Sequence, residues 1–238
     1  MLELLRNKKI MIVVAHPDDE LLGLGGTLNK LSQDYSSNIK VVILGEGITS
    51  RDITRDVAAR EDDLIRHKEN VEEARQIIGY DSFSLYDFPD NRFDTIPLLD
   101  IIKVVEAEKQ NFEPFAIFTH HGGDLNIDHQ ITFDAVITAC RPLNYERVSA
   151  IITFETPSGT EWRASTDPEH FIPNFHVEIN ENNLNAKIEA MEAYQFEKRI
   201  YPHPRSPKAL RIHSQYRGLT VGVSYAEAFN IVRLQSNI

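Results

Sequence analysis

The chain has 238 residues, of which 42% are hydrophobic, and a formal net charge of −11 at pH 7. This length fits one large domain with a sizeable core. The negative charge argues against general nucleic-acid binding, which depends on phosphate neutralisation by Lys and Arg. No apolar run approaches the roughly 20 residues that span a bilayer. The N-terminal residues lack a signal-peptide pattern, and the single cysteine, Cys140, excludes an intramolecular disulfide. We therefore expect a cytoplasmic protein.

Apolar runs alternate with amphipathic segments along the first two thirds of the chain. The sequence predicts strands at Lys9–Val14, Lys40–Leu44, Ser82–Tyr86, Phe115–Thr119 and Val148–Phe154. It predicts helices near Asp19–Gln33, Ile53–Ile78, Ile96–Gln110 and Asp128–Cys140, the second of them ended by Gly79. Such alternation indicates βαβ units, and hence a Rossmann-like three-layer α/β fold with a mainly parallel sheet.

The last third of the chain is less regular. Thr156–Thr160 is typical of a turn or loop, Asn185–Lys198 predicts a helix, and Val221–Leu234 contains strand-like patches. We expect residues 1–238 to form a single domain. Its core would comprise about 1–155, and the elements of about 156–238 would contribute to substrate binding or to oligomer contacts.

A polar motif follows the first predicted strand. The apolar run Ile10–Val14 leads into Ala15-His16-Pro17-Asp18-Asp19-Glu20. In open α/β sheets, ligands bind at the carboxyl ends of the strands. These residues can supply two metal ligands and a proton acceptor, as hydrolytic metal chemistry requires. The alternative is an ordinary helix start, with acidic residues in the first turn and His16 in the preceding turn.

A second polar cluster, residues 120–130, follows the fourth predicted strand and contains His129. Because two strand ends of one parallel sheet can face the same crevice, we expect His129 to lie near the first motif. His16, Asp19 and His129 then form a His₂–carboxylate set. This is a plausible zinc site with three protein ligands and an open position for water.

Three other features have two interpretations each. Gly23–Gly26 favours close helix–sheet packing over a dinucleotide loop, because the turn after the strand carries carboxylates instead of glycines. Trp162 either stacks on a sugar ring or packs in the core or an interface. His120 and His121 either line the site or close the strand.

Ala15–Glu20 and Asn126–His129 resemble the two metal motifs of the PIG-L/LmbE-like de-N-acetylase family. That family includes the deacetylases of N-acetylglucosaminyl-phosphatidylinositol and of mycothiol and bacillithiol synthesis. The resemblance implies a Rossmann-like α/β fold and zinc-dependent removal of acetyl from an N-acetylated amino sugar. It extends over most of the chain.

Carried over to this sequence, the family pattern makes His16, Asp19 and His129 the zinc ligands and Asp18 the general base. The division is physically sensible, because Asp19 is used by the metal while Asp18 stays free to accept a proton. Zinc lowers the pKa of a bound water toward roughly 7, so a carboxylate suffices as the acceptor.

Two weaker matches imply substrate contacts. Arg66, in Arg66-His67-Lys68-Glu69, is similar to the Arg-x-x-Glu helix of the family. Asp90, in Phe88-Pro89-Asp90, lies where the family has a substrate-contacting acidic loop.

The chain departs from the family at position 126, where many members have a His that is thought to stabilise the oxyanion. Asn126 can still donate a hydrogen bond there, and Asp128 can orient His129 or Asn126. His203 is a substitute donor. Alternatively, Asn126 and Asp128 simply satisfy backbone groups of the loop.

A basic segment runs from Lys198 to Arg217 without any acidic residue. It contains Lys198, Arg199, His203, Arg205, Lys208, Arg211, His213 and Arg217. The segment is either a solvated face, a subunit contact of a homo-oligomer, or a rim that receives an anion. The last interpretation favours a substrate that carries phosphate or a nucleotide diphosphate, bound by Arg205 beside His203.

For the whole protein, the leading hypothesis is a zinc amidohydrolase acting on an N-acetyl amino sugar. The alternatives are a zinc hydrolase of another amide or ester, and a non-catalytic metal- or nucleotide-binding module. Asp18 favours an enzyme, because a binding module has no use for a free carboxylate beside the metal.

Overall fold

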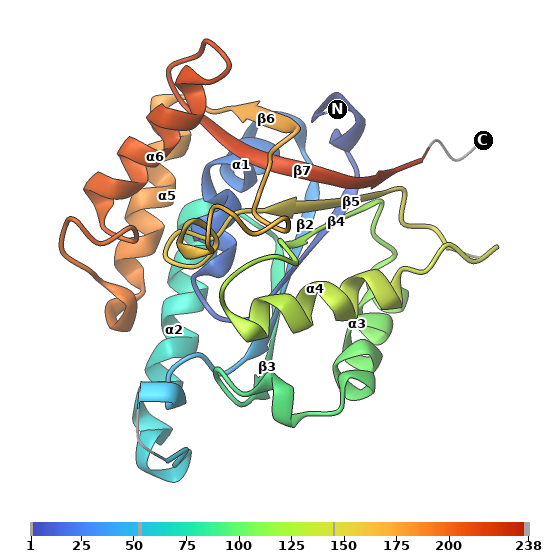
Figure 1. Ribbon diagram of the computed structural model, residues 1–238, viewed down its shortest axis with the longest axis vertical. Coiled ribbons are helices and arrows are strands. Elements are labelled where there is room, and N and C mark those ends of the chain that lie inside the picture. Colours follow the sequence, from blue (N-terminus) through green and yellow to red (C-terminus); the bar gives the residue numbers. More distant parts are fainter. Residues whose placement is uncertain (1, 52–53, 145, 236–238) are drawn as a thin grey trace.

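The computed structural model describes residues 2–51, 54–144 and 146–235, which are built around a seven-stranded sheet (Figure 1). The strand order is β3-β2-β1-β4-β5-β7-β6. β3, β2, β1, β4 and β5 are parallel, whereas β7 lies antiparallel between β5 and β6. The strands are β1 (Lys9–Val14), β2 (Asn38–Gly45), β3 (Ser82–Phe88), β4 (Ala116–His120), β5 (Ala150–Phe154), β6 (Phe175–Glu178) and β7 (Ala226–Leu234).

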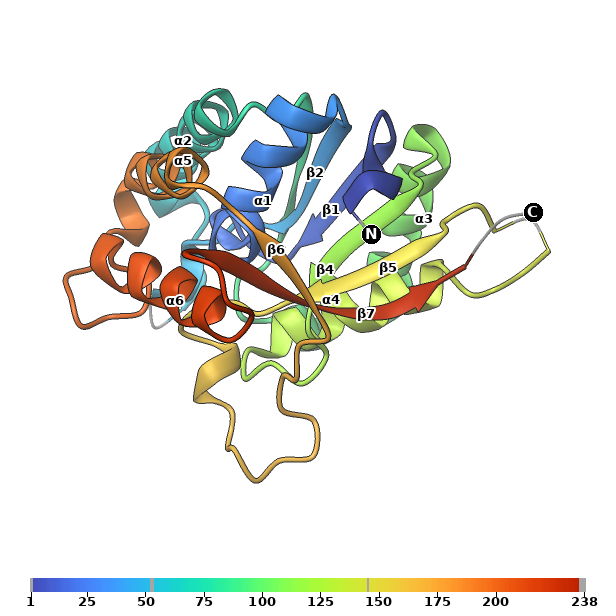
Figure 2. The same ribbon diagram turned by 90° about the horizontal axis from the view of Figure 1, so that it is seen from above.

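Helices cover both faces of the sheet (Figure 2). α1 (Asp19–Tyr35), α2 (Glu61–Ile78) and α5 (Glu181–Ala193) lie on one face, and α3 (Leu98–Phe112) and α4 (Ile127–Ala139) on the other. α6 (Pro207–Leu219) packs beside α5 and β7. Short 3₁₀ helices lie at Leu2–Leu5, Thr49–Arg51, Ala58–Arg60, Phe93–Thr95, Thr160–Trp162 and Gln195–Glu197. Among the described helices, none is long and apolar enough to cross a membrane.

The two faces of β1 belong to two separate hydrophobic clusters. Ile10, Ile12 and Val14 pack toward the α1 side, while Met11 and Val13 pack toward the α3 side. A strand that is buried on both faces reads as a continuous apolar run, which is why the sequence revealed it. The predicted three-layer α/β fold with a mainly parallel sheet is confirmed.

The connections reverse direction between β1 and β4. From β1 the chain builds β2 and β3 on one side, and it then returns to place β4 and β5 on the other. The carboxyl ends of β1 and β4 therefore lie next to each other at a topological switch point, where this class of sheet binds its ligands. Both polar motifs of the sequence begin at these two ends.

The C-terminal third differs most from the sequence-based prediction. α5 begins at Glu181, four residues before the predicted Asn185, because Asn180 and Asn183 form a reciprocal capping box. α6 was not predicted, although Ser206 caps it and Pro207 occupies its first turn. β6 was also missed. The predicted start of the second helix at Ile53 lies outside the described residues, and α2 begins at Glu61.

Gly23 lies in α1 directly against the sheet. A Cβ atom at this position would lie 2.2 Å from Cδ2 of the buried Phe154 ring, whereas a Cβ at Gly25 would meet the flexible Lys187 stem at 3.0 Å. A Cβ atom at Gly26 would lie 2.7 Å from Cδ1 of Ile179. The interpretation of Gly23–Gly26 as a close-packing segment is therefore confirmed.

We expect Gly23→Ala to destabilise the protein by about 1–3 kcal/mol, because the rigid Phe154 ring has no room to move. Gly25→Ala is the matched control and should destabilise it less, since the Lys187 stem can shift. Urea unfolding of both variants measures the difference. Equal stabilities would contradict the packing argument.

Glu155 joins the end of β5 to α6. Its carboxylate accepts hydrogen bonds from Nε of Arg217, at 2.7 Å, and from Nη2 of the same guanidinium. His213 Nε2 lies 3.5 Å from the carboxylate. Burial opposes ionisation of Glu155, but His213 and Arg217 outweigh it and lower the pKa of this carboxyl to about 2.

This lowered pKa predicts an acid-labile attachment of α6. A carboxyl whose pKa is lower in the folded than in the unfolded chain stabilises the fold above its unfolded value, about 4.3. That stabilisation is lost as the pH falls from about 5 toward 2. Glu155→Gln should therefore reduce the dependence of the unfolding free energy on pH across this range. An unchanged pH dependence in denaturant titrations would show that the pair contributes nothing.

Candidate active site

The loop after β1 is a tight turn held by its own carboxylates. Asp18 has a left-handed backbone with φ of 98°, a strained conformation for a residue other than glycine. Glu20 Oε2 accepts from the Asp18 N–H at 3.1 Å, and Glu20 Oε1 accepts from the Tyr194 hydroxyl at 2.7 Å. Asp19 Oδ2 accepts from the His16 N–H at 2.9 Å. These bonds fix the direction in which each acidic side chain points.

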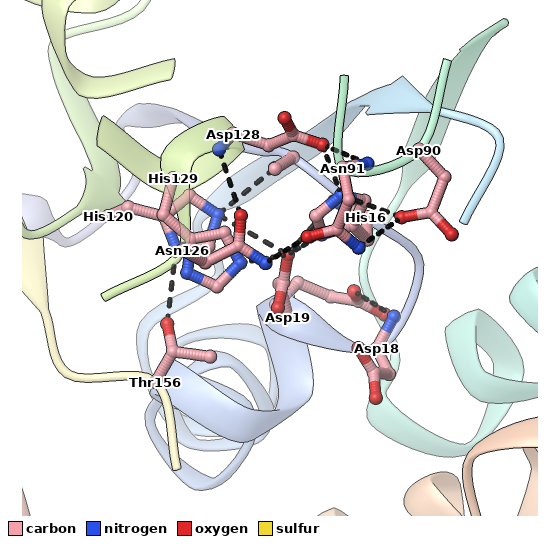
Figure 3. A network of polar contacts seen from close by, with 12 residues as sticks. His16, Asp18, Asp19, Asp90, Asn91, His120, Asn126, Asp128, His129 and Thr156 are labelled. Carbon is pink, nitrogen blue, oxygen red and sulfur yellow. Dashed lines mark hydrogen bonds and ion pairs between the residues drawn. The ribbon is translucent and has the colours of Figure 1, made fainter. Parts of the chain in front are cut away.

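His16, Asp19 and His129 converge in one buried cluster (Figure 3). One donor atom from each residue lies within 4.8 Å of the others. Asp19 Oδ2 is 3.3 Å from His16 Nδ1 and 3.3 Å from His129 Nε2. The structure thus brings together the three residues that the sequence singled out as metal ligands.

The cluster fits a divalent metal ion. Asp19 Oδ1 and both ring nitrogens of His129 are buried without a hydrogen-bond partner in the described part of the chain. Although burial disfavours charge, the Asp19 and Asp124 carboxylates raise the pKa of His129 to about 9. The pKa of His16 is likewise raised, against the effect of burial, by Asp128 and Asp19. The cluster therefore favours a positive charge, and two imidazoles with a carboxylate are a zinc-type donor set.

Each imidazole has a second carboxylate on its other nitrogen. Asp128 Oδ2 lies 2.9 Å from His16 Nε2, and Asp124 Oδ1 lies 3.2 Å from His129 Nδ1. This arrangement leaves His16 Nδ1 and His129 Nε2 facing Asp19. Carboxylates of this kind fix the tautomer and orientation of metal-binding histidines. Asp128 was expected to support His129 or Asn126, whereas the structure places its carboxylate against His16.

Asp124 was not assigned a role from the sequence, and for His120 the sequence left open whether it lines the site or closes the strand. His120 stacks on His129 at a ring-centroid distance of 3.8 Å, and its Nε2 accepts from the Ala15 N–H at 3.0 Å. His120 thus lies directly behind the cluster. His121 points away from it and contacts the Glu169 carbonyl. Asp124 lies in the sequence between the end of β4 and His129. That position could have indicated a carboxylate partner for His129.

Asn126 is held by its own loop and by the loop after β3. Its Oδ1 accepts from the Asp128 N–H at 2.8 Å and caps α4, while its Nδ2 donates to Asn91 Oδ1 at 3.2 Å. Asn126 still lines the cavity in front of the cluster. Its geometry agrees with the interpretation that it satisfies loop backbone groups.

The cavity in front of the cluster has a volume of about 260 Å³. The N-terminal part of the chain contributes His16, Asp18, Arg51 and Asp90, and the C-terminal part contributes Ser158, Trp162, Glu197, Arg199, His203 and Arg205. Asp90 lies 3.3 Å from His16 Nε2 and accepts from the Ser50 hydroxyl at 2.6 Å. Trp162 is half exposed at the cavity and meets the His203 ring edge-on at 6.0 Å.

Asp18 faces this cavity beside the cluster. Its Oδ2 accepts from the Arg205 guanidinium at 2.8 Å, and the same guanidinium contacts Ser158 Oγ at 2.7 Å. Burial raises the pKa of the Asp18 carboxyl well above its usual value, with Arg205 opposing the shift. Arg205 is therefore next to Asp18, an arrangement that the sequence did not predict.

Arg66 is a predicted site residue that the structure places neither in the buried cluster nor in the lining of the cavity. It lies on α2 with its side chain half exposed, 3.5 Å from Glu69 on the same helix. Its spacing from Glu69 places both side chains on one helix face, and that face points to solvent. The substrate contact expected of Arg66 is therefore not supported by its position.

A donor set of two imidazoles and a carboxylate, at the switch point of a mainly parallel sheet, defines this protein as an α/β protein with a buried candidate metal centre. The chain belongs to the PIG-L family, whose model, described as GlcNAc-PI de-N-acetylase, matches residues 11–140. The family resemblance of the two sequence motifs is thereby confirmed.

The individual relatives share low sequence identity with this chain. An uncharacterized deacetylase of Escherichia coli K12, YaiS, is 27% identical over 195 residues, which cover 80% of this chain and 92% of the relative. N,N'-diacetylchitobiose deacetylase from Pyrococcus horikoshii is 19% identical, with a TM-score of 0.75 over 95% of this chain and 84% of that chain. GalB, the 4-carboxy-2-hydroxymuconate hydratase from Pseudomonas putida KT2440, is 18% identical, with a TM-score of 0.74 over 97% and 99%. The solved structures of this fold thus include proteins named as a deacetylase and as a hydratase.

Proposed function

We propose that this protein is a zinc-dependent hydrolase that removes the acetyl group from an N-acetylated amino sugar. The observation that carries the proposal is the pairing of a His₂–carboxylate donor set with a separate carboxylate, Asp18, that faces the same cavity. Membership of a de-N-acetylase family supports the choice of an acetamide as the reacting group.

His16, Asp19 and His129 would hold the metal, His16 through Nδ1 and His129 through Nε2. When bound, zinc supplies a Lewis acid for the acetamide carbonyl and lowers the pKa of a water molecule. Asp128 and Asp124 keep the two imidazoles in the tautomers that present these nitrogens. Asp128 is in this proposal a positioning residue and not a proton carrier.

Asp18 is the proposed general base. It accepts a proton from the attacking water, whose oxygen forms the new bond to the carbonyl carbon. As the C–N bond breaks, the same proton passes from Asp18 to the leaving amine nitrogen, which gives acetate and the free amino sugar. Arg205 holds one oxygen of Asp18 at 2.8 Å and leaves the other oxygen for the proton.

Residues from about 156–238 are proposed to bind the sugar, because they contribute six side chains to the lining of the cavity that His16 and Asp18 also line, namely Ser158, Trp162, Glu197, Arg199, His203 and Arg205. His203 is proposed as the hydrogen-bond donor to the oxyanion, since the Asn126 amide is held by its bonds to the Asp128 N–H and to Asn91 Oδ1. Asp90 is proposed to contact sugar hydroxyls with the carboxylate oxygen that faces His16.

We expect Asp18→Asn to retain the metal and to lower turnover by about 10²–10⁴-fold, because it removes the proton acceptor and leaves all three ligands. Acetate release from N-acetylglucosamine and N,N'-diacetylchitobiose, together with elemental analysis, measures both quantities. Asp100→Asn, an exposed position on α3, is the control. Parental activity in Asp18→Asn would place the base elsewhere. Release of another carboxylic acid or an alcohol in a wider screen would favour a different amide or ester.

We also expect Asp128→Asn to weaken metal binding by about 10–100-fold. The two oxygens of Asp128 serve three donors, namely His16 Nε2, the Asn91 N–H and the Phe93 N–H. An amide nitrogen in place of either oxygen would face at least one of these donors. Chelator competition measures the affinity, and Asp134→Asn, exposed on the same helix, is the matched control. An unchanged affinity would contradict the role of Asp128 and His16.

A further inference from the structure

Glu197 is an acidic side chain enclosed by three guanidinium groups inside the cavity. Its Oε2 lies 3.1 Å from an Arg205 nitrogen and 3.4 Å from an Arg199 nitrogen, and its Oε1 pairs with Arg51. Only 5% of the residue is exposed. All four side chains line the cavity.

The other arginines of the basic segment, and Lys198, are also paired with carboxylates. Arg211 pairs with Glu181 at 2.6 Å, Arg217 pairs with Glu155, and Lys198 lies 3.7 Å from Glu192. Lys208 lies over the ring of Tyr201 at 4.4 Å. Every arginine of the segment therefore has a carboxylate partner within the chain, and the segment presents no unpaired guanidinium to a ligand.

We infer that Glu197 is the specificity-determining residue of the site, and that it makes the enzyme select uncharged N-acetyl sugars over phosphorylated ones. This inference rests on the proposed deacetylation. The guanidinium groups of Arg51, Arg199 and Arg205 form the kind of fork that binds phosphate. Glu197 occupies that fork as an internal anion. This inference is the opposite of the sequence-based expectation that Arg205 belongs to a rim that receives an anion.

Electrostatics gives the direction of the selection. A phosphate group in this cavity would have to displace the Glu197 carboxylate from its three partners, or lie beside it and near Asp18 and Asp90. Like charges placed together in a partly desolvated site are strongly unfavourable. An uncharged sugar avoids both penalties, and its ring can pack against the exposed Trp162 indole.

The test compares substrates within one protein preparation. Acetate release is measured with N-acetylglucosamine and with its 1- and 6-phosphates, and the kcat/KM of each phosphate is divided by that of the uncharged sugar. We expect this ratio to be below about 0.1 in the parent protein. Glu197→Gln keeps the shape and one acceptor oxygen of the side chain, and it should raise the ratio at least about tenfold. Because the ratio is internal, a general loss of activity does not affect it.

Glu192→Gln is the matched control, since Glu192 pairs with the same basic segment outside the cavity, and its ratio should equal that of the parent. Inorganic phosphate provides an independent readout. With equal metal content in both proteins, phosphate should bind Glu197→Gln at least about tenfold more tightly in calorimetry.

Two results would overturn the inference. One is a parent protein that prefers either phosphate. The other is a Glu197→Gln variant with an unchanged ratio and unchanged phosphate binding. If no preparation releases acetate from any of these sugars, the proposed deacetylation fails instead. Phosphate calorimetry then still decides whether Glu197 fills an anion site.

Discussion

The burial of many carboxyl groups at one sheet edge is the constraint on which the rest of this structure depends. Six of them surround the adjacent ends of β1 and β4, namely Asp18, Asp19, Glu20, Asp90, Asp124 and Asp128. An isolated charge in such a place is prohibitively unfavourable, so each group needs a partner or must give up its charge. The partners are imidazoles for Asp19, Asp124 and Asp128, the Tyr194 hydroxyl for Glu20, Ser50 for Asp90 and Arg205 for Asp18.

These partners come from distant parts of the chain, and they therefore connect the site to the whole fold. Asp128, at the start of α4, accepts from backbone N–H groups of the loop after β3 as well as from His16. Glu20 reaches Tyr194 at the end of α5, and Asp18 reaches Arg205 just before α6. The C-terminal third is thus not an appendage to the sheet. It supplies a cation, Arg205, for the acidic edge.

The parts that could be predicted from sequence are those that depend on local pattern. β1 was evident because both of its faces are buried, and His16, Asp19 and His129 were brought together by the rule that parallel strand ends share a crevice. The partner of Arg205 could not be predicted, because 187 positions separate it from Asp18 and no periodicity relates them. α6 was missed since its basic residues were interpreted as a surface or an anion-binding rim, although its capping residues were present. Arg66 shows the reverse case, where a local motif match pointed to a site that the helix face does not reach.

The cavity is divided between two parts of the chain that differ in how firmly their side chains are held. The N-terminal part contributes the donor set and Asp18, which are fixed by β1, β4 and α4 and leave little freedom for change. The opposite wall comes from loops around Trp162 and His203, whose side chains are only partly buried. Substitutions at Trp162 or His203 leave the buried carboxylates with their partners, whereas substitutions at Asp124 or Asp128 would leave an imidazole without its partner. The loops around Trp162 and His203 are therefore the part of the cavity that can vary while the ion pairs at the strand ends are kept.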